Sequence, residues 1–229
     1  CVGKLDNKVF KVKEIFLPKL KSTQSKNNHL KEMNFTFLVF FDISFTKESI
    51  KSLRRIIEKQ KPTMVFFLGK YEKEESSMFI DEYKHILLFF IHSKDDLPRK
   101  FQPISSGKNY KIITNPGEII FNNFKIGFVV SELFSYKVKG RFINKNYQES
   151  FVTSYLSQGS YNPFANIDYS YEHMPNIIFV GQNSFAGVLN FQGVNFVSVS
   201  SFDKSGVYFK CDNCFNIVLC DCNEEDSEL

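Results

Sequence analysis

Three uninterrupted apolar segments, separated by patterns typical of helices, constrain the fold of this chain most strongly. They cover Phe37–Phe41, Met64–Leu68 and residues 86–91. Continuous apolar runs of this length are typical of strands that are covered on both faces of a sheet. Thr46 stands in the N-cap position of a helical pattern between the first two segments, and residues 75–83 form a weaker helical pattern before the third. The alternation of strand and helix predicts an α/β domain with parallel strand pairing.

The second half of the chain carries shorter strand patterns. Strands are predicted at residues 111–113, 118–121, 125–130, 176–180, 194–199, 207–210 and 216–219, and a helix at residues 148–156. At the other end, residues 1–18 alternate loosely and predict a hairpin, whereas residues 19–31 are polar and indicate a linker. We therefore expect a small N-terminal unit at residues 1–18, a linker at 19–31, and one large domain at 32–229.

Composition excludes some classes of protein. The 229 residues include 27 Phe, and 43% of all residues are hydrophobic, which is enough for a sizeable core. The apolar segments are far shorter than the roughly 20 residues that cross a bilayer, so we expect no membrane contact. The chain starts at Cys1 without an initiator Met, and we expect this start to lie within a domain of a longer protein.

The net charge of +4 is distributed unevenly. Residues 1–31 contain eight Lys against two acids, whereas residues 221–229 contain five acids and no base. One interpretation is that both ends are simply solvated. The other is that the basic segment contacts nucleic acid or an acidic partner. The total charge is too small to imply nucleic-acid binding by itself.

Four of the five cysteines lie close together, at Cys211, Cys214, Cys220 and Cys222. Their spacing resembles that of zinc ligands. We expect instead a β-hairpin in which Asp212-Asn213 forms a two-residue loop. Cys220 would then lie roughly 20 Å along the strand from Cys214, at about 3.3 Å per residue. One zinc ion with bonds of about 2.3 Å cannot join both pairs, so we expect no structural zinc and, without a secretory signal, reduced thiols.

Polar residues stand where the predicted buried strands end. These strand ends are Asp42-Ile43-Ser44, Gly69-Lys70, His92 followed by Asp95-Asp96, and Gly181-Gln182-Asn183-Ser184. In open α/β sheets, ligands bind outside the carboxyl ends of the strands, which makes these residues the candidate site. Their order resembles the calcineurin-like metallophosphoesterases. In that family the corresponding strand ends carry D-x-H, G-D-x-x-D, G-N-H-D/E and G-H-x-H, and they hold two metal ions.

The ligands that such a two-metal centre needs are largely missing from this sequence. Ser44 replaces the His of the first motif, Lys70 replaces the metal-bridging Asp of the second, and Gln182 with Ser184 replaces both His of the last. We therefore expect a vestigial site without catalytic residues, metal or cofactor. Its positions are Asp42, Ser44, Gly69, Lys70, His92, Asp95, Gly181, Gln182 and Ser184.

Several stretches resemble the B subunits of the eukaryotic replicative DNA polymerases, a family with an inactivated calcineurin-like phosphoesterase domain. Leu97-Pro98-Arg99 is similar to part of that family's L-P-R-P-P segment, and Asn115-Pro116 to its T-N-P turn. Phe151-Val152, with Leu156-Ser157-Gln158-Gly159, is similar to the F-V-x-x-x-L-S-Q-G stretch of the epsilon branch. Upstream, Gly3, Phe10, Val12 and Leu17-Pro18 resemble the closing strands of the OB fold that precedes the phosphoesterase domain in this family.

This resemblance implies both a fold and a function. The fold would be an α/β, metallophosphoesterase-like sandwich of two mixed β-sheets flanked by helices, preceded by an OB-fold remnant in residues 1–18. The function would be that of a non-catalytic accessory subunit of DNA polymerase epsilon in the nucleus. Such a subunit holds the cysteine-rich C-terminal module of the catalytic subunit, links it to other replication factors, and has at most a weak contact with DNA.

Three alternatives remain open at the level of sequence. The chain could be a B subunit of polymerase alpha or delta, since Asn162-Pro163-Phe164 resembles the alpha subunit. It could be an active metal-dependent phosphoesterase or nuclease that uses Asp42, His92 and Asp95. It could bind nucleic acid directly through its basic N-terminal segment.

Overall fold

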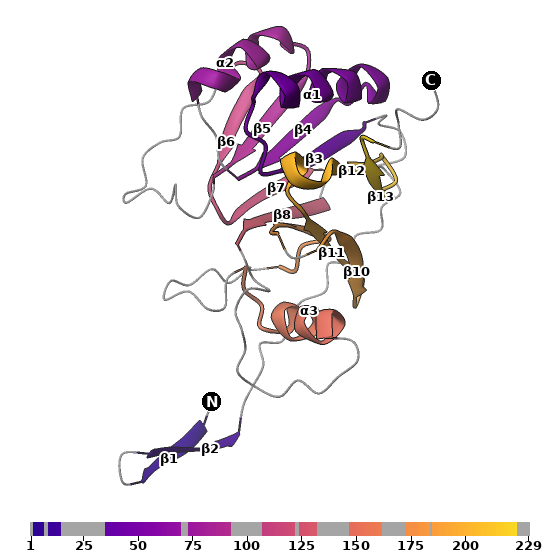
Figure 1. The fold of residues 1–229 in the computed structure, drawn as a ribbon. Coiled ribbons are helices and arrows are strands. Elements are labelled where there is room, and N and C mark those ends of the chain that lie inside the picture. Colours follow the sequence, from indigo (N-terminus) through magenta and orange to yellow (C-terminus); the bar gives the residue numbers. More distant parts are fainter. Residues whose placement is uncertain are drawn as a thin grey trace.

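The computed structural model describes residues 2–6, 9–14, 35–69, 73–92, 107–121, 124–131, 147–161, 173–183 and 185–223. Two layers of strands make up the centre of the molecule, and helices cover their outer faces (Figure 1). No helix among the described residues is long and apolar enough to cross a membrane.

Within these residues, the first layer is a six-stranded sheet in the order β13-β12-β3-β4-β5-β6. Its strands are β3 (Phe37–Phe41), β4 (Met64–Leu68), β5 (Leu87–Ile91), β6 (Tyr110–Ile113), β12 (Val207–Cys211) and β13 (Ile217–Asp221). The four strands from β3 to β6 are parallel, as the alternation of strand and helix predicts. The β12–β13 hairpin continues the sheet beyond β3 in antiparallel pairing.

The second layer has the order β10-β11-β9-β8-β7 in the described chain. Its strands are β7 (Gly117–Phe121), β8 (Phe124–Val130), β9 (Ile177–Gly181), β10 (Gly187–Phe191) and β11 (Val194–Val199). The inner strands β8, β9 and β11 are parallel, and each outer strand pairs antiparallel with its neighbour. Both sheets are therefore mixed, which confirms the sequence-predicted fold class of a metallophosphoesterase-like sandwich flanked by helices.

Each sheet has its own helical cover. The helices are α1 (Lys47–Gln60), α2 (Lys73–Glu82), α3 (Tyr147–Ser157) and the short α4 (Phe202–Ser205). Figure 1 shows α1 and α2 on the outer face of the six-stranded sheet and α3 on the opposite side, over the five-stranded sheet. Thr46 caps α1 as expected, because its Oγ1 accepts a hydrogen bond from the Ser49 N–H at 3.3 Å.

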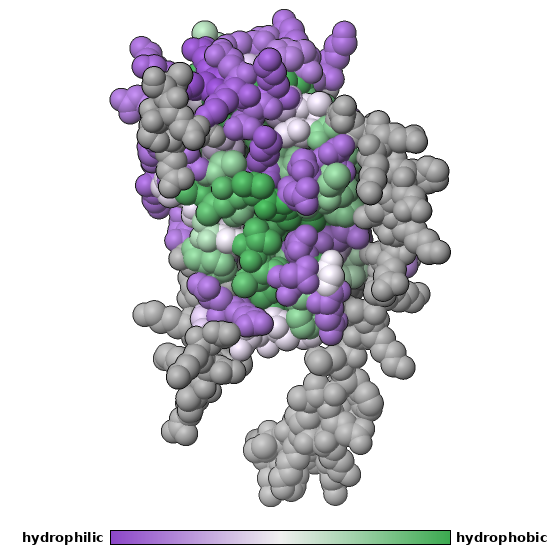
Figure 2. All heavy atoms as spheres, turned by 90° about the vertical axis from the view of Figure 1, so that its right-hand side faces the viewer, coloured by the Kyte–Doolittle hydropathy of each residue, from purple (hydrophilic) through white to green (hydrophobic). Residues whose placement is uncertain are grey.

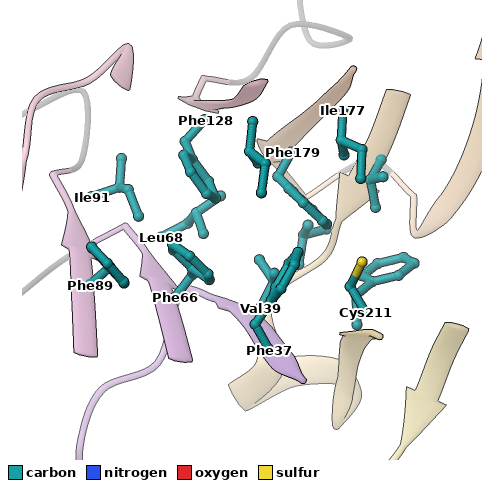
Figure 3. Close-up of a cluster of buried hydrophobic side chains, with 14 of the residues drawn as sticks. Phe37, Val39, Phe66, Leu68, Phe89, Ile91, Phe128, Ile177, Phe179 and Cys211 are labelled. Atoms are coloured by element: carbon teal, nitrogen blue, oxygen red, sulfur yellow. The ribbon is translucent and has the colours of Figure 1, made fainter. Parts of the chain in front are cut away.

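Aromatic side chains fill the space between the two sheets (Figure 3). The period of two along β3 turns Phe37, Val39 and Phe41 towards the other sheet and Leu38 and Phe40 towards the helices. From the facing sheets, Phe66 stacks on Phe128 with ring centroids 4.8 Å apart. Burial of each such side chain stabilises the fold by about 1.5–3 kcal/mol. The Phe-rich composition is therefore explained mainly by this interior.

Most predicted elements are present in the structure, and the structure also contains two elements that we did not predict. Strands at Phe37–Phe41, Met64–Leu68 and Val194–Val199 have the expected bounds, and the other expected strands and helices differ by one or two residues at their ends. The sequence pattern did not indicate β10 or α4. β10 begins at a glycine and carries Asn190 among its apolar residues, and α4 is a single turn.

The turn between β12 and β13 differs from the two-residue loop that we predicted. Cys211 pairs with Ile217, and the Asp212 N–H donates to the Asn216 carbonyl, so a longer loop joins the strands. The carboxylate of Asp212 organises this loop, because its Oδ1 accepts from the backbone N–H groups of Cys214 and Asn216 at 2.8 and 3.0 Å. Phe215 follows with a left-handed φ of 59°.

The cysteines lie on different faces of the six-stranded sheet. Cys211 points into the space between the sheets, whereas Cys220 and Cys222 pack on the helical side. Burial raises the pKa of the Cys211 thiol, and a neighbouring charge on Asp212 adds to this effect, so Cys211 is a poor source of a thiolate ligand. The sheet itself therefore separates Cys211 from Cys220 and Cys222.

The N-terminal residues form a separate two-stranded sheet of β1 (Val2–Asp6) and β2 (Val9–Glu14), as the loose alternation predicted. That this hairpin is a remnant of an OB fold, and that residues 19–31 are a linker, stay predictions. The predicted linker lies outside the described residues.

A shortened chain that starts at Lys31 should fold without the N-terminal hairpin. The hairpin shares no strand with the two large sheets, whose core begins at Phe35. We expect cooperative urea unfolding followed by circular dichroism, with a midpoint close to that of the full chain. A broad, non-cooperative transition in the shortened chain would contradict this prediction and show that the hairpin supports the core.

Candidate functional site

The carboxyl ends of the parallel strands form one edge of the six-stranded sheet. The register aligns Phe41, Leu68 and Ile91 on β3, β4 and β5. The next residues on these strands, Asp42, Gly69 and His92, therefore lie side by side. The Asp42 N–H donates to the Leu68 carbonyl at 2.9 Å, and the Gly69 N–H donates to the Ile91 carbonyl at 3.0 Å.

The five-stranded sheet brings a fourth predicted position to the same edge. Gly181 ends β9 and pairs with Val130 and Val199 on the neighbouring strands. After Val199 the chain crosses to the other sheet, where Ser201 forms a parallel bridge with Phe41. The strand ends of both sheets thus meet around β3, and Gly181-Gln182 faces the end of β3.

The ring of Phe41 fills the space where these strand ends meet. A Cβ atom added at Gly181 would lie 2.5 Å from Cδ2 of Phe41, and one added at Gly69 would lie 3.4 Å from Cε2. Phe41 itself is only 6% exposed. Gly181 is therefore needed because an aromatic ring packs against its backbone, and Gly69 because its φ is 112°. In this position the ring excludes other groups from the space between β4 and β9.

Gln182, at the position of a metal-binding His in the family motif, is fully buried and part of a neutral hydrogen-bond network. Its Nε2 donates to Oγ of Ser198 at 2.8 Å, and that hydroxyl donates to the Phe185 carbonyl at 2.5 Å. Its backbone N–H donates to the Val199 carbonyl at 3.0 Å. No described buried side-chain nitrogen or oxygen lacks a partner. The amide is therefore fixed by the protein itself.

A carboxylate from α4, which sequence reasoning did not identify, holds the loop after β3. Oδ2 of Asp203 accepts from the Ser44 N–H, and its Oδ1 accepts from the Ser49 hydroxyl, both at 2.9 Å. Asp203 thereby ties this loop and the first turn of α1 to α4. A single acid in a four-residue helix gives no sequence signal for such a role.

Asp42 has a left-handed φ of 53°, which Asp and Asn tolerate better than most residues.

The described donors do not fit a two-metal centre. Asp42 and His92 are both partly exposed, and β4 lies between their strands, which places them about 10 Å apart at the usual strand spacing. Nowhere in the described ranges do three His, Cys, Asp or Glu residues gather where they could hold a metal ion. Lys70, Asp95 and Ser184 lie outside these ranges.

Two of the family-motif segments have clear structural roles. Asn115 clamps the end of β8, because its Nδ2 donates to the Val130 carbonyl and its Oδ1 accepts the Val130 N–H, both at 2.9 Å. The Asn115-Pro116 peptide bond is cis. This segment is the crossover from β6 in one sheet to β7 in the other. Leu97, Pro98 and Arg99 are outside the described residues.

The second segment ends α3. Leu156 is fully buried, and Gly159 closes the helix with a left-handed φ of 67° and an N–H that donates to the Leu156 carbonyl. The Ser157 hydroxyl and the Gln158 amide both donate to the Ser154 carbonyl. This motif therefore specifies the end of a helix that covers the five-stranded sheet.

No protein-family model matches the chain, and no curated protein matches it either. Solved structures that are similar to it include an archaeal phosphodiesterase at 9% identity, which covers 81% of this chain and 98% of its own, with a TM-score of 0.48. A predicted phosphoesterase from Streptococcus pneumoniae TIGR4 has 11% identity, coverage of 83% and 91%, and a TM-score of 0.46. Vacuolar protein sorting 29 from Cryptosporidium parvum has 13% identity, coverage of 82% and 98%, and a TM-score of 0.47.

The contact between Phe41 and Gly181 can be tested by a double-mutant cycle. We expect Gly181→Ala to destabilise the parent by about 1–3 kcal/mol, because its methyl group overlaps the ring. Phe41→Ala should cost about 3–5 kcal/mol. In the Phe41→Ala background the added methyl has room, so the cost of Gly181→Ala should disappear, as measured by urea unfolding.

Gly187→Ala is the matched control for this cycle. Its added Cβ would lie 3.7 Å from Phe185, an ordinary contact, and it should be additive with Phe41→Ala. Additivity of Gly181→Ala with Phe41→Ala would show that the ring does not occupy the space between the strand ends.

Proposed function

We propose that this chain is a non-catalytic accessory subunit of a replicative DNA polymerase, of the epsilon branch of the B-subunit family. The observation that carries the proposal is the filled strand-end site. At these strand ends the ring of Phe41 packs against Gly69 and Gly181, and the buried amide of Gln182 bonds to Ser198. Both groups are uncharged and fixed by packing or hydrogen bonds. They support a scaffold and leave no evident route to metal-dependent hydrolysis.

The hydrogen bonds that hold two of the described strand-end segments suit a subunit whose work is to hold other proteins. Asp203 anchors the loop after β3, and Asn115 anchors the crossover between the sheets. In enzymes such loops carry catalytic groups, whereas here they brace the two sheets against each other. We propose that the surfaces of this frame bind the cysteine-rich C-terminal module of the epsilon catalytic subunit and other replication factors in the nucleus.

The motif residues support the proposed membership of the B-subunit family more than they support the choice of one catalytic subunit as the partner. Asn115, Leu156 and Gly159 act within the fold, so their resemblance to the B subunits reflects shared architecture. The alpha and delta branches remain the next candidates. The segment Asn162-Pro163-Phe164, which resembles the alpha subunit, lies outside the described residues. A weak contact with DNA through the basic residues 1–31 belongs to the same proposal.

Binding to purified catalytic-subunit modules separates the three branches. We expect the full chain to co-purify with the zinc-loaded, cysteine-rich module of epsilon, and to bind the alpha and delta modules at least about tenfold more weakly, equivalent to about 1.4 kcal/mol. Size-exclusion chromatography of mixtures, followed by calorimetric titration, gives the comparison. Preference for alpha or delta would move the chain to that branch, and failure with all three would contradict the accessory role.

The second candidate function is a metal-dependent phosphoesterase, favoured by Asp42 and His92 at the ends of β3 and β5. Thermal melts with manganese test it. If the scaffold proposal is right, the melting temperature of the parent will not rise with manganese, and Asp42→Asn will match the parent. Asn is the appropriate substitution because it removes the charge and still tolerates the left-handed backbone at this position.

A functional metal site would give a different result. At a manganese concentration of about 100 Kd, binding adds about 2.7 kcal/mol of stability. For a protein of this size that raises the melting temperature by roughly 5–10 °C. A rise of this kind in the parent that is lost in Asp42→Asn, together with manganese-dependent cleavage of a generic phosphodiester, would overturn the non-catalytic assignment.

A further inference from the structure

β13 is the last strand at one end of the six-stranded sheet, and no strand of the described residues pairs with its outer edge. Asp212 and Cys222 lie at the two ends of the hairpin in backbone-bonded pairs with Asn216 and Gly206. Because bonded and non-bonded pairs alternate in an antiparallel ladder, Val218 and Cys220 also bond to β12. The N–H and C=O groups of Ile217, Leu219 and Asp221 therefore point outward, and no described strand pairs with them.

The side chains along this edge are apolar and exposed. Val218 is 52% exposed and Leu219 is 48% exposed. Leu219 pairs with Phe209 and so lies on the inner face of its sheet, while Val188, 41% exposed, pairs with Val197 on the inner face of the other sheet. Figure 2 views the side of the molecule where Figure 1 shows β10 and β13, and a hydrophobic patch occupies the middle of that face. Apolar side chains from both sheets are thus exposed at this rim.

Two of the other three outer strands of the large sheets carry charged residues, whereas β10 carries none. Lys111 lies in β6 and Glu118 in β7. Charges of this kind protect strand edges from pairing with other chains. β13 has no charge from Ile217 to Cys220. An apolar edge next to an exposed hydrophobic rim has the features of a strand-addition site.

The charge around β13 indicates what kind of segment fits it. Residues 211–229 contain six acids, Asp212, Asp221, Glu224, Glu225, Asp226 and Glu228, against one cation on the neighbouring strand, Lys210, which pairs with Val218. Two copies of the chain that paired through β13 would bring twelve acids together, which disfavours a homodimer. A basic segment would instead be attracted. Its alternate apolar side chains would cover the rim at Leu219 and Val188.

We propose that β13 binds an extended segment of a partner protein in which apolar residues alternate with Lys or Arg, and that this segment adds a strand to the six-stranded sheet. The inference does not depend on the proposed polymerase role. It rests on the register, exposure and charge of this edge alone. Main-chain hydrogen bonds to Ile217, Leu219 and Asp221 would provide affinity, and the rim would select the apolar side chains.

A labelled peptide of alternating Lys and Val, seven residues long, is the probe, and fluorescence anisotropy with the full chain is the measurement. We expect saturable binding that weakens with salt, because acids near the edge contribute. A peptide with Glu in place of Lys should not bind. A Lys-Val peptide with alternate N-methylated backbone amides should also fail, because it keeps every side chain and cannot pair with a strand.

Two matched variants locate the site on the protein. Leu219→Lys should weaken binding at least about tenfold, whereas Ile120→Lys, at a position 68% exposed on the β7 edge, should leave it within about twofold. The peptide arms decide the question even if Leu219→Lys fails to fold. Absence of saturable binding, or equal binding of the N-methylated peptide, would overturn the proposal. A dimer that Leu219→Lys dissolves would overturn it too, by assigning the edge to a second copy.

Discussion

A layer of phenylalanine rings between the two sheets determines the interior of the molecule and also the state of its strand ends. Phe66 stacks on Phe89 within one sheet and on Phe128 across the gap, with centroids 4.7 and 4.8 Å apart (Figure 3). Aromatic pairs of this geometry contribute about 0.5–1.5 kcal/mol beyond their buried area. The same period of two that points Phe37 inward also points Phe41 inward. The aromatic layer therefore continues to the end of β3, where the ring meets Gly181.

Closure of the site follows from this packing and from the polar groups around it. A two-metal centre needs space and anionic or imidazole ligands at the strand ends. Here the ring of Phe41 packs between the strand ends, the amide of Gln182 bonds to Ser198, and the carboxylate of Asp203 accepts from the Ser44 N–H. The loop after β3 and the crossover at Asn115 brace the sandwich. The exposed apolar rim at Leu219 and Val188 lies on β13 and β10, and so on other strands than these ends.

Local patterns were sufficient to predict much of the fold. The buried runs at β3 and β4 and the cap at Thr46 specified the parallel α/β core, and this placed Asp42, Gly69 and His92 at one edge. The sequence did not predict the short strand β10, because Gly187 and Asn190 interrupt its apolar pattern. The prediction of a two-residue β12–β13 loop was wrong, because the Asp212 carboxylate stabilises a longer turn than the residue types suggest.

The state of the candidate site required tertiary information. Phe41 and Gly181 are distant in sequence, and nothing local to either position indicates that a ring packs against a glycine. The role of Asp203 depends on where α4 returns to β3. The resemblance in sequence predicted that Ser44 and Gln182 stand in place of metal ligands, and this stays a prediction. It could not show that Gln182 would turn inward to Ser198.

A crystal structure determined after soaking in manganese tests the central claim most directly. Anomalous scattering locates the metal without reference to any assumed ligand. We expect no anomalous peak within bonding distance of Asp42, His92 or Gln182, and a Phe41 ring that stays packed against Gly69 and Gly181. One or two strong peaks between these strand ends, with the ring displaced, would contradict it.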